Sequence, residues 1–442
     1  MTTRRGLIQA GLAGAVGLVT GQATARAQNL GDAKPGDGNN KVNTERVRPG
    51  LESLAISGYS PLAGLKVGLV TNPTGILPDY TSTIEALYRA PGVKLRALFG
   101  PEHGIRGNIS AGDEVASSVD SQTKLPVYSL YGKTRVPTAA MLKGLDALIF
   151  DMQDIGARSY TYVSTLGCVM EGAAAQGIPV IVLDRPNPVG LNRIEGGPPR
   201  GAFLGSYVSK YPIAYLHGMT LGELAKMING SGWLPGGRLC ELTVIPCENL
   251  RRNMATWESF GGLPWVPTSP HIPQSTTPAF YALTGIVGEL STVATGIGYP
   301  LPFELAGGPG IDSFALSKEL TRRNLPGMIF RPHFWTPYYG SMTDRTCGGV
   351  QIHLPELTAS ATTRLASLTR FNFELLDALR KLNRSRSFFT SSESTRMFDL
   401  GCGTDRVRKA FLSGASASDM WNIFNEGRDA FTALRSSYLI YI

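Results

Sequence analysis

The stretch Lys66-Val-Gly-Leu-Val70-Thr-Asn72-Pro73 decides the fold, because a short apolar run there ends abruptly on polar residues and a proline. Runs of the same kind recur further along the chain, at 94–99, 127–130, 147–150 and 180–183. Helical or loop patterns separate these runs. Short β-forming runs that alternate with helical patterns predict an α/β fold with a parallel sheet and crossover helices.

Helix signals fall between and after these runs. Ser82-Thr-Ile-Glu85 predicts a capping box that opens a helix over 84–89. A second helix is expected over 161–175, with Gly177-Ile-Pro179 as its stop signal. We also expect a helix at 221–229, a strand at 242–245, a long helix around 358–382 and an amphipathic helix around 420–435.

A proline-rich stretch interrupts the chain at Gly261-Gly-Leu-Pro-Trp265-Val-Pro-Thr-Ser-Pro270-His-Ile-Pro273. So many prolines are incompatible with a helix or a central strand. We therefore place a domain boundary there. The first domain is expected over 51–262 and a smaller second domain over 263–442.

The N-terminal residues 1–27 predict an export signal. Arg4-Arg5 precedes an uncharged stretch, and Ala25-Arg26-Ala27 supplies a cleavage site of the A-x-A kind. Adjacent arginines ahead of a weakly apolar stretch resemble the bacterial twin-arginine signal. Residues 28–50 are polar and rich in Asn, Gly and Asp, which predicts a flexible leader. We expect a periplasmic or otherwise exported protein without a stable membrane span.

The composition excludes several classes of protein. With 43% hydrophobic and 17% charged residues, the chain is neither collagen-like nor disordered through excess charge. The net charge of +8 falls to +5 without the three arginines of 1–27. Because no Lys/Arg-rich run, RNA-binding aromatic signature or zinc-finger spacing occurs, we expect no nucleic-acid partner. The five cysteines form no CxxC pair, which argues against a disulfide framework and a structural zinc site.

Polar side chains follow four of the predicted strands at their carboxyl ends. They are Asn72 after 66–70, Glu102 and His103 after 94–99, Asp151 and Asp154 after 147–150, and Asp184, Arg185 and Asn187 after 180–183. Ligands of open parallel sheets bind beyond the carboxyl ends of the strands. We therefore expect a ligand crevice at this edge.

The sequence contains no GxSxG, GxxxxGK[ST], GxGxxG or HExxH motif. A cluster of carboxylates, His and Arg suits glycosidic cleavage instead, in which two carboxylates face each other across a sugar. Glu102 is our candidate acid, because a proton donor that works near neutral pH must lie partly out of water. The alternative is a loop carboxylate that bonds backbone amides. His103 either orients a hydroxyl, tunes Glu102 or satisfies the loop backbone.

The next motif, Asp151-Met-Gln-Asp154-Ile-Gly-Ala-Arg158-Ser-Tyr160, allows two interpretations at each polar position. Asp154 is either the second carboxylate or the cap of the following turn. Arg158 and Arg185 either bind a substrate carboxylate in two-pronged fashion or pair with the aspartates of the same edge. Tyr160 either stacks on a sugar or packs in the core.

Seven stretches, in order along the chain, carry a family resemblance. They are Gly68-Leu-Val-Thr-Asn-Pro-Thr-Gly75, Leu98-Phe-Gly-Pro-Glu-His-Gly-Ile-Arg-Gly107, Phe150-Asp-Met-Gln-Asp-Ile-Gly-Ala-Arg158 with Tyr160-Thr-Tyr162, Leu183-Asp-Arg-Pro-Asn-Pro188, His217-Gly-Met-Thr-Leu-Gly-Glu-Leu224, Gly262-Leu-Pro-Trp-Val-Pro-Thr-Ser-Pro270 and Gly349-Val-Gln-Ile-His353. Together they resemble the NamZ-type exo-β-N-acetylmuramidases, a family of peptidoglycan-recycling glycoside hydrolases. The resemblance implies a Rossmann-like first domain, a smaller α/β second domain of the α+β kind, and an active cleft between them. It also implies release of N-acetylmuramic acid from the non-reducing end of peptidoglycan fragments, with Glu102 at the position of the catalytic glutamate.

One segment departs from the family pattern. Where members have Glu-Gly-Thr-Asn and then a Gly-Arg-Gly-Thr turn, this chain has Glu289-Leu-Ser-Thr and Thr295-Gly-Ile-Gly-Tyr-Pro300. Glu289 is retained and the Arg is not, so ligand choice or activity would diverge here. The lactyl carboxylate of N-acetylmuramic acid suits a bidentate Arg, for which the candidates are Arg158, Arg185 and Arg106.

We expect peptidoglycan-derived sugars or muropeptides as partners, no cofactor and no bound metal. The oligomeric state and the retaining, inverting or substrate-assisted course stay open. The candidate substrate-binding residues are Asn72, Arg106, Asp151, Arg158, Tyr160, Asp184, Arg185, Asn187, His217 and Glu289. One alternative is an exported, non-catalytic sugar- or muropeptide-binding protein with the same fold. Another is a metal-dependent amidohydrolase or deacetylase that uses His103 with Asp151 or Asp184.

Overall fold

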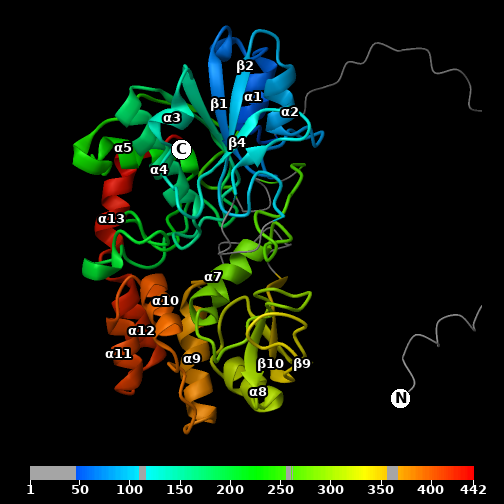
Figure 1. Cartoon of the computed structure of the whole chain (residues 1–442). Helices are drawn as coiled ribbons and strands as arrows, with labels where there is room; N and C mark the ends of the chain where they lie inside the picture. The colour runs from blue at the N-terminus through cyan, green and yellow to red at the C-terminus, as the bar shows by residue number, and fades with distance from the viewer. Residues whose placement is uncertain (1–45, 109–115, 255–259, 261, 356–366) are drawn as a thin grey trace, which may run out of the picture. The chain divides into compact units, whose positions relative to one another are not determined.

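The computed structural model describes residues 46–108, 116–254, 260, 262–355 and 367–442 (Figure 1). All of these residues fall within one compact unit of the chain. The expected export signal lies outside the described residues, as does the leader up to residue 45.

The last residues of the expected leader, 46–50, take part in the fold. Val47 is fully buried, and Arg48 exchanges two backbone hydrogen bonds with Glu248, of 3.0 and 2.8 Å. The first helix starts at Gly50. The folded part therefore begins before residue 51, because an apolar Val and a backbone bridge tie this segment down.

A seven-stranded sheet organises the first half of the chain. Its strands are β1 Lys66–Thr71, β2 Lys94–Gly100, β3 Ser118–Val119, β4 Pro126–Ser129, β5 Ala147–Asp151, β6 Val180–Leu183 and β7 Leu242–Ile245. They lie in the order β3-β4-β2-β1-β5-β6-β7, and every pair is parallel except β3 with β4. Without the short β3, this is the Rossmann order, in which the chain reverses direction across the sheet between β1 and β5. The predicted strands, parallel pairing and Rossmann-like class are confirmed.

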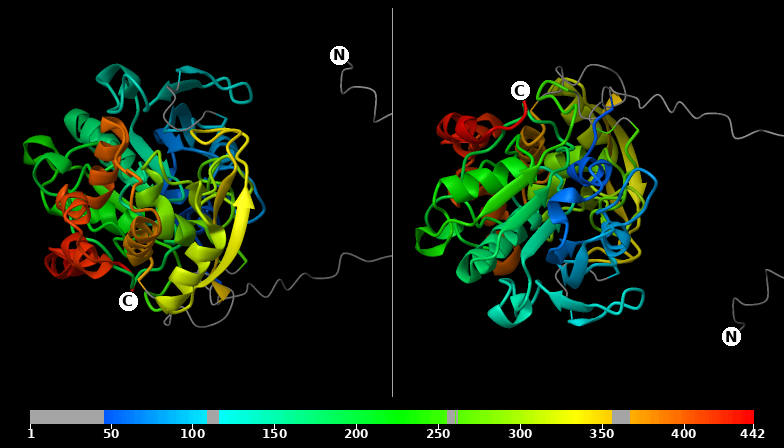
Figure 2. Two further views of the ribbon diagram at one scale, coloured as in Figure 1. Left: turned by 90° about the horizontal axis from the view of Figure 1, so that it is seen from below. Right: turned by 90° about the horizontal axis from the view of Figure 1, so that it is seen from above.

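Helices cover both faces of this sheet, as the two views of Figure 2 show. They are α1 Gly50–Ile56, α2 Thr83–Arg89, α3 Ala139–Leu142, α4 Tyr162–Gln176 and α5 Leu221–Gly230, with short 3₁₀ turns at Ser60–Leu62, Gly201–Phe203 and Pro235–Gly237. Val70 and Phe150 pack with α4 and α5, whereas their strand neighbours Leu69 and Ile149 pack with α1 and α2. Because both faces are buried, the strands are continuous apolar runs rather than alternating ones.

The helix ends follow the predicted signals. The Ser82 side chain accepts a hydrogen bond from the Glu85 N–H at the start of α2. At the end of α4, Gly177 adopts φ 65° and its N–H bonds back to the last turn. Thr220 and Glu223 form a complete capping box at the start of α5.

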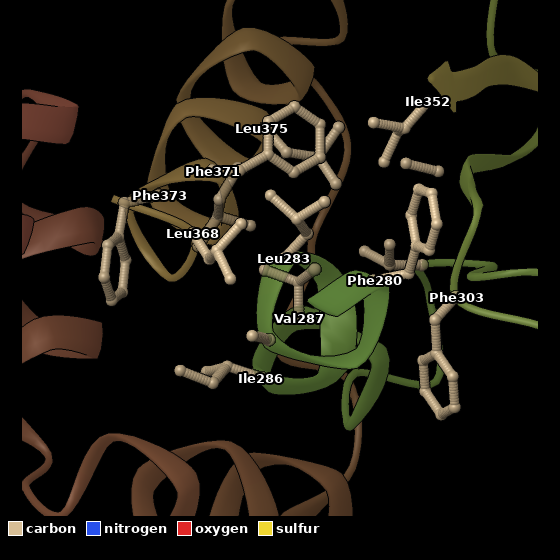
Figure 3. Packing of buried hydrophobic residues seen from close by; sticks show 14 of the residues in the cluster. Phe280, Leu283, Ile286, Val287, Phe303, Ile352, Leu368, Phe371, Phe373 and Leu375 are labelled. Carbon is tan, nitrogen blue, oxygen red and sulfur yellow. The ribbon is translucent and has the colours of Figure 1, made fainter. Parts of the chain in front are cut away.

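The second half holds a three-stranded antiparallel sheet in the order β8-β10-β9. Its elements are α7 Thr277–Gly288, β8 Leu305–Pro309, α8 Ser313–Arg322, β9 Ile329–Trp335, β10 Cys347–His353, α9 Arg370–Leu382, α10 Ser392–Cys402, α11 Arg406–Leu412, α12 Ala417–Asn425, α13 Arg428–Arg435 and the 3₁₀ turn Ser436–Tyr438. Leu283 and Val287 of α7 lie against Phe371 and Leu375 of α9 in its core (Figure 3). Burial of each such side chain contributes about 1.5–3 kcal/mol.

Two predicted helices differ from those observed. The helix expected over 358–382 is described only from Arg370 onward, and 358–366 lie outside the described residues. The helix expected over 420–435 is in fact two helices, α12 and α13. Gly427, at φ 86°, separates them, because a left-handed residue cannot continue an α-helix.

The last segment of the chain returns to the seven-stranded sheet. Phe431 of α13 belongs to the core that contains α4 and α5. The Arg435 guanidinium donates to the carbonyls of Leu191, at 3.1 Å, and Gly218, at 2.5 Å. The Tyr441 hydroxyl donates to Asp184 Oδ2 at 2.5 Å and accepts from the Cys247 N–H at 3.0 Å. Within the described ranges, no helix combines the length and apolar character that a bilayer crossing requires.

Replacing Tyr441 by Phe tests this attachment. The substitution leaves Asp184 Oδ2 and the Cys247 N–H each short of one buried partner, so we expect a loss of about 1–3 kcal/mol in the free energy of unfolding. Urea denaturation at neutral pH measures it. Tyr88→Phe is the control, since Tyr88 is 51% exposed. Equal stability of the two variants would contradict a structural role for the Tyr441 hydroxyl.

Candidate active site

The loops after β1, β5 and β6 meet at one edge of the sheet. Arg185 donates from Nε to Asp151 Oδ1 at 2.5 Å and from Nη2 to Asp151 Oδ2 at 2.9 Å. Its Nη2 also donates to the Ile76 carbonyl, at 3.1 Å. Thr83, at the start of α2, donates to Asp151 Oδ2 at 2.5 Å. Both charged groups are buried, so this ion pair fixes the edge at which the candidate site lies.

Glu102 lies in the loop directly after β2 and is only 9% exposed. The Thr161 hydroxyl, one residue before α4, donates to Glu102 Oε2 at 2.6 Å. The Tyr131 side chain, just after β4, lies near the Glu102 carboxylate, and burial, followed by the charge of this carboxylate, raises the pKa of Tyr131. The Thr161 hydroxyl therefore holds Glu102 in place, with Tyr131 as a neighbour.

The turn around His103 is unusual in its backbone. His103 and Gly104 have successive φ values of 71° and 74°, and the Gly104 N–H donates to the Pro101 carbonyl at 2.9 Å. A His at positive φ carries strain that the surrounding structure must offset. His103 is buried. Burial lowers the pKa of the neighbouring His271, and the charge of His103 lowers it further.

Arg106, Arg158 and Arg185, which we expected to bind a substrate carboxylate, all have partners within the protein. Arg185 pairs with Asp151, and Arg106 pairs with Asp120 at 2.5 Å. Arg158 is 2% exposed and donates to four backbone carbonyls, those of Gly197, Ile213, Leu400 and Gly401. For Arg158 and Arg185 the interpretation of internal pairing is the one that the geometry favours, although Arg158 pairs with carbonyls rather than with an aspartate.

Asp154 and His217 form a buried pair near the same edge. Burial raises the pKa of Asp154 to about 7 and lowers that of His217 to about 3. Asp154 Oδ2 accepts from the Gly156 N–H at 2.7 Å and lies 3.9 Å from His217 Nε2, while among the described atoms Asp154 Oδ1 and His217 Nε2 have no hydrogen-bond partner. Gly156, at φ 82°, leaves no room for a Cβ beside Asn187. Asp154 thus caps the following turn, which is the second of the two roles expected for it.

The space beside Asp154 is small. A cavity of about 10 Å³ is lined by Asp154, Asn187, Thr220 and neighbouring residues. Ligand pockets are usually larger, about 300–1,000 Å³. A sugar therefore reaches Asp154 only if the surrounding loops move.

Several other expected site residues support the loops. Asp184 is fully buried among Thr220, Gly222 and Tyr441, and burial raises its pKa to about 6. Asn187 donates to the Met219 carbonyl at 2.9 Å, as a bridge between two loops. Asn72 donates to the Tyr162 hydroxyl at 2.7 Å.

A row of tyrosine rings runs through the site. The rings of Tyr160 and Tyr162 lie 4.9 Å apart and those of Tyr160 and Tyr281 lie 6.4 Å apart, both edge to face. The charge of Glu102 contributes to the raised pKa of Tyr162, and that of Glu289 contributes to the raised pKa of Tyr281. Glu102 and Glu289 therefore lie near the two ends of this row.

Glu289 caps the carboxyl end of α7 and is more exposed than Asp154. Burial raises its pKa to about 7, yet its side chain stays partly accessible to solvent. A carboxyl with such a pKa exchanges protons near neutral pH, which suits acid or base chemistry.

Sequence reasoning missed Tyr131, Thr161 and Tyr281. The rule that selected Glu102, a polar side chain just beyond a strand, also applies to Tyr131 after β4 and would have found it. No local signal distinguishes Tyr281, which reaches the site from α7. Nowhere in the described part do three His, Cys, Asp or Glu side chains gather into a metal-binding group.

The raised pKa of Asp154 predicts a pH effect on stability. The ordinary value is 3.8 and the folded value is about 7, so between these pH values the unfolded chain has lost its proton and the folded chain still holds it. Stability is therefore greatest below about pH 4 for this group and falls as the pH rises toward 7, by an amount on the order of a few kcal/mol. We expect Asp154→Asn to remove this fall, because an amide does not titrate.

Urea midpoints from pH 4 to 8 measure the effect. Asp429→Asn is the matched control, because the side chain of Asp429 is 90% exposed. The prediction fails if Asp154→Asn keeps the pH profile of the unmodified protein.

Comparison with known proteins identifies the family. Models of the N-terminal and C-terminal parts of the exo-β-N-acetylmuramidase NamZ match residues 67–276 and 279–441. A curated relative, the peptidoglycan β-N-acetylmuramidase NamZ of Bacillus subtilis (strain 168), is 37% identical over 409 residues, which cover 92% of this chain and 95% of the relative.

Two crystal structures of DUF1343 family proteins from Bacteroides fragilis NCTC 9343 are also similar. One has a TM-score of 0.83 and 40% identity, and the match covers 90% of this chain and 100% of that protein. The other has a TM-score of 0.71 and 30% identity, with 89% and 99% covered. Matches of this extent in sequence and fold show that the chain is a glycoside hydrolase that belongs to the exo-β-N-acetylmuramidase NamZ family.

Proposed function

We propose that this protein releases N-acetylmuramic acid from the non-reducing end of peptidoglycan fragments, with Glu102 as general acid and base. The Bacillus subtilis relative bears the name of a peptidoglycan β-N-acetylmuramidase, which supports the substrate class. The observation that carries the role of Glu102 is its position. It is a nearly buried carboxyl at the carboxyl edge of a Rossmann-like sheet, held by the Thr161 hydroxyl and with Tyr131 beside it.

In its protonated form Glu102 donates to the glycosidic oxygen as the bond to C1 breaks. It then takes a proton from the water that attacks C1, which restores the acid. The Thr161 hydroxyl orients the carboxyl, so little reorganisation precedes the proton transfer.

A second group must act at the opposite side of the sugar. Either the 2-acetamido carbonyl of the substrate or an enzyme carboxyl serves. Among the carboxyls, Glu289 fits this requirement better than Asp154, since Glu289 is accessible to solvent and Asp154 lines only a small cavity. Its raised pKa lets Glu289 either donate a hydrogen bond to an acetamido group or accept a proton.

The competing function is an exported protein that binds sugars or muropeptides without cleaving them. The departure at Thr295-Gly-Ile-Gly-Tyr-Pro300 motivates it. Incubation with a chromogenic β-N-acetylmuramide separates the two functions, because only the enzyme releases the chromophore.

We expect Glu102→Gln to lower kcat on a natural β-muramide by about 100- to 10,000-fold, because an amide cannot deliver a proton to the leaving oxygen. A substrate with a good leaving group, such as p-nitrophenolate, should lose much less. Glu241→Gln provides the control, because Glu241 is exposed and precedes β7 at the opposite edge of the sheet. A folded Glu102→Gln variant with near-normal kcat would disprove this role.

We further propose that the protein works outside the cytoplasm after export through the twin-arginine route. The Arg4-Arg5 pair and the Ala25-Arg26-Ala27 site support it. Replacing Arg4 and Arg5 together by Lys should leave uncleaved precursor in the cytoplasm, as immunoblots of cell fractions would show. Normal export in a strain that lacks the twin-arginine translocase would rule the route out.

A further inference from the structure

The site needs a cation for the lactyl carboxylate, and the three arginines expected for it have internal partners. Arg106 and Arg185 are each held by an aspartate, and Arg158 is held by backbone carbonyls. A different arginine, Arg135, lies in the loop that follows β4. Its side chain is exposed, and in the part of the chain that the structure describes no carboxylate pairs with it.

Two tyrosine rings hold Arg135 in place. Its guanidinium carbon lies 4.2 Å from the centroid of the Tyr207 ring and 5.8 Å from that of the Tyr131 ring. The two rings lie 5.9 Å apart at 55° and form a corner around the cation. Contact with ring faces orients a guanidinium but uses none of its N–H donors, which stay available for an anion.

The tyrosine corner is itself anchored. The Tyr207 hydroxyl lies 2.9 Å from Thr165 Oγ1 of α4, and the Ser164 hydroxyl donates to the Tyr207 carbonyl at 2.6 Å. The neighbouring cation, Lys210, already has a carboxylate partner, since its Nζ lies 3.7 Å from Glu171. Among the described residues, Arg135 is therefore the cation that contacts both rings of this corner and has no carboxylate partner.

The corner adjoins the candidate acid. Tyr131 contacts Arg135 on its ring face and lies close enough to Glu102 for that carboxylate, after burial, to raise the pKa of Tyr131. The charges of Glu102 and Arg135 act in opposite directions on the pKa values of both Tyr131 and Tyr207. One tyrosine thus separates the carboxyl from the cation.

We propose that Arg135 is a specificity-determining residue that binds the lactyl carboxylate of the N-acetylmuramic acid unit cleaved at Glu102. The inference rests on the proposed function. In this sugar the lactyl ether is on O3 and the scissile bond is at C1, so C2 and its acetamido group lie between the carboxylate and the glycosidic oxygen. The Tyr131 side chain lies between Glu102 and Arg135, so the acid and the cation are separated as the glycosidic oxygen and the carboxylate of the sugar are. A guanidinium binds a carboxylate through two parallel hydrogen bonds.

The test compares two sugars and two variants. Kinetics are measured with p-nitrophenyl β-N-acetylmuramide and with p-nitrophenyl β-N-acetylglucosaminide, which lacks only the lactyl group. We expect Arg135→Met to lower kcat/KM on the muramide by about 10- to 150-fold, the range for a charge-assisted hydrogen bond, and to change it less than about threefold on the glucosaminide. Arg135→Lys, which keeps the charge without the two-pronged geometry, should fall between.

Lys133→Met is the matched control, because Lys133 is an exposed cation of the same loop and the cation–π contacts of the described residues do not include it. It should leave both rates unchanged. An equal loss on both sugars in Arg135→Met would overturn the assignment, as would unchanged rates on the muramide.

Binding separates this inference from the proposed function. If the unmodified protein cleaves neither sugar, the catalytic proposal fails, and calorimetric affinities for free N-acetylmuramic acid and N-acetylglucosamine decide the role of Arg135. Preference for N-acetylmuramic acid that disappears in Arg135→Met supports it. Equal affinities for both sugars, or no binding of either, contradict it.

Discussion

The buried ion pair between Arg185 and Asp151 is the constraint on which the rest of the site depends. Asp151 ends β5 and Arg185 follows β6, and their contacts with the Ile76 carbonyl and Thr83 add the loop after β1 and the start of α2. A buried charge without its partner costs several kcal/mol, so these four segments must come together whenever the protein folds. The edge they form lies at the reversal between β1 and β5, and the loop that carries Glu102 leaves the neighbouring strand β2.

The strands, their parallel order and the edge that carries the polar residues could be predicted from the sequence, because buried central strands are continuous apolar runs that end on polar residues. The candidate acid could be predicted for the same reason. The partners of the arginines could not. Arg158 bonds the carbonyls of Leu400 and Gly401, more than two hundred residues away, and a backbone carbonyl leaves no mark in a sequence. The break between α12 and α13 had a local sign in Gly427, which the amphipathic pattern on either side obscured.

The tyrosines of the site fall into two groups by position. Tyr160, Tyr162 and Tyr281 form an aromatic wall between the two acidic residues Glu102 and Glu289, and Tyr131 links Glu102 to the cation at the other side. Tyr162 is fully buried and packs in the core, whereas Tyr160 and Tyr281 are partly accessible.

The return of the chain end to the first sheet makes the two halves inseparable. Asp184, at the end of β6, receives a hydrogen bond from Tyr441, although the whole three-stranded sheet lies between them in the sequence. Residues 67–276, which one family model covers, therefore lack a part of their own support when they are produced as a separate recombinant fragment. Contacts between residues so far apart also raise the contact order, which slows folding and makes the protein a poor candidate for dissection into independent modules.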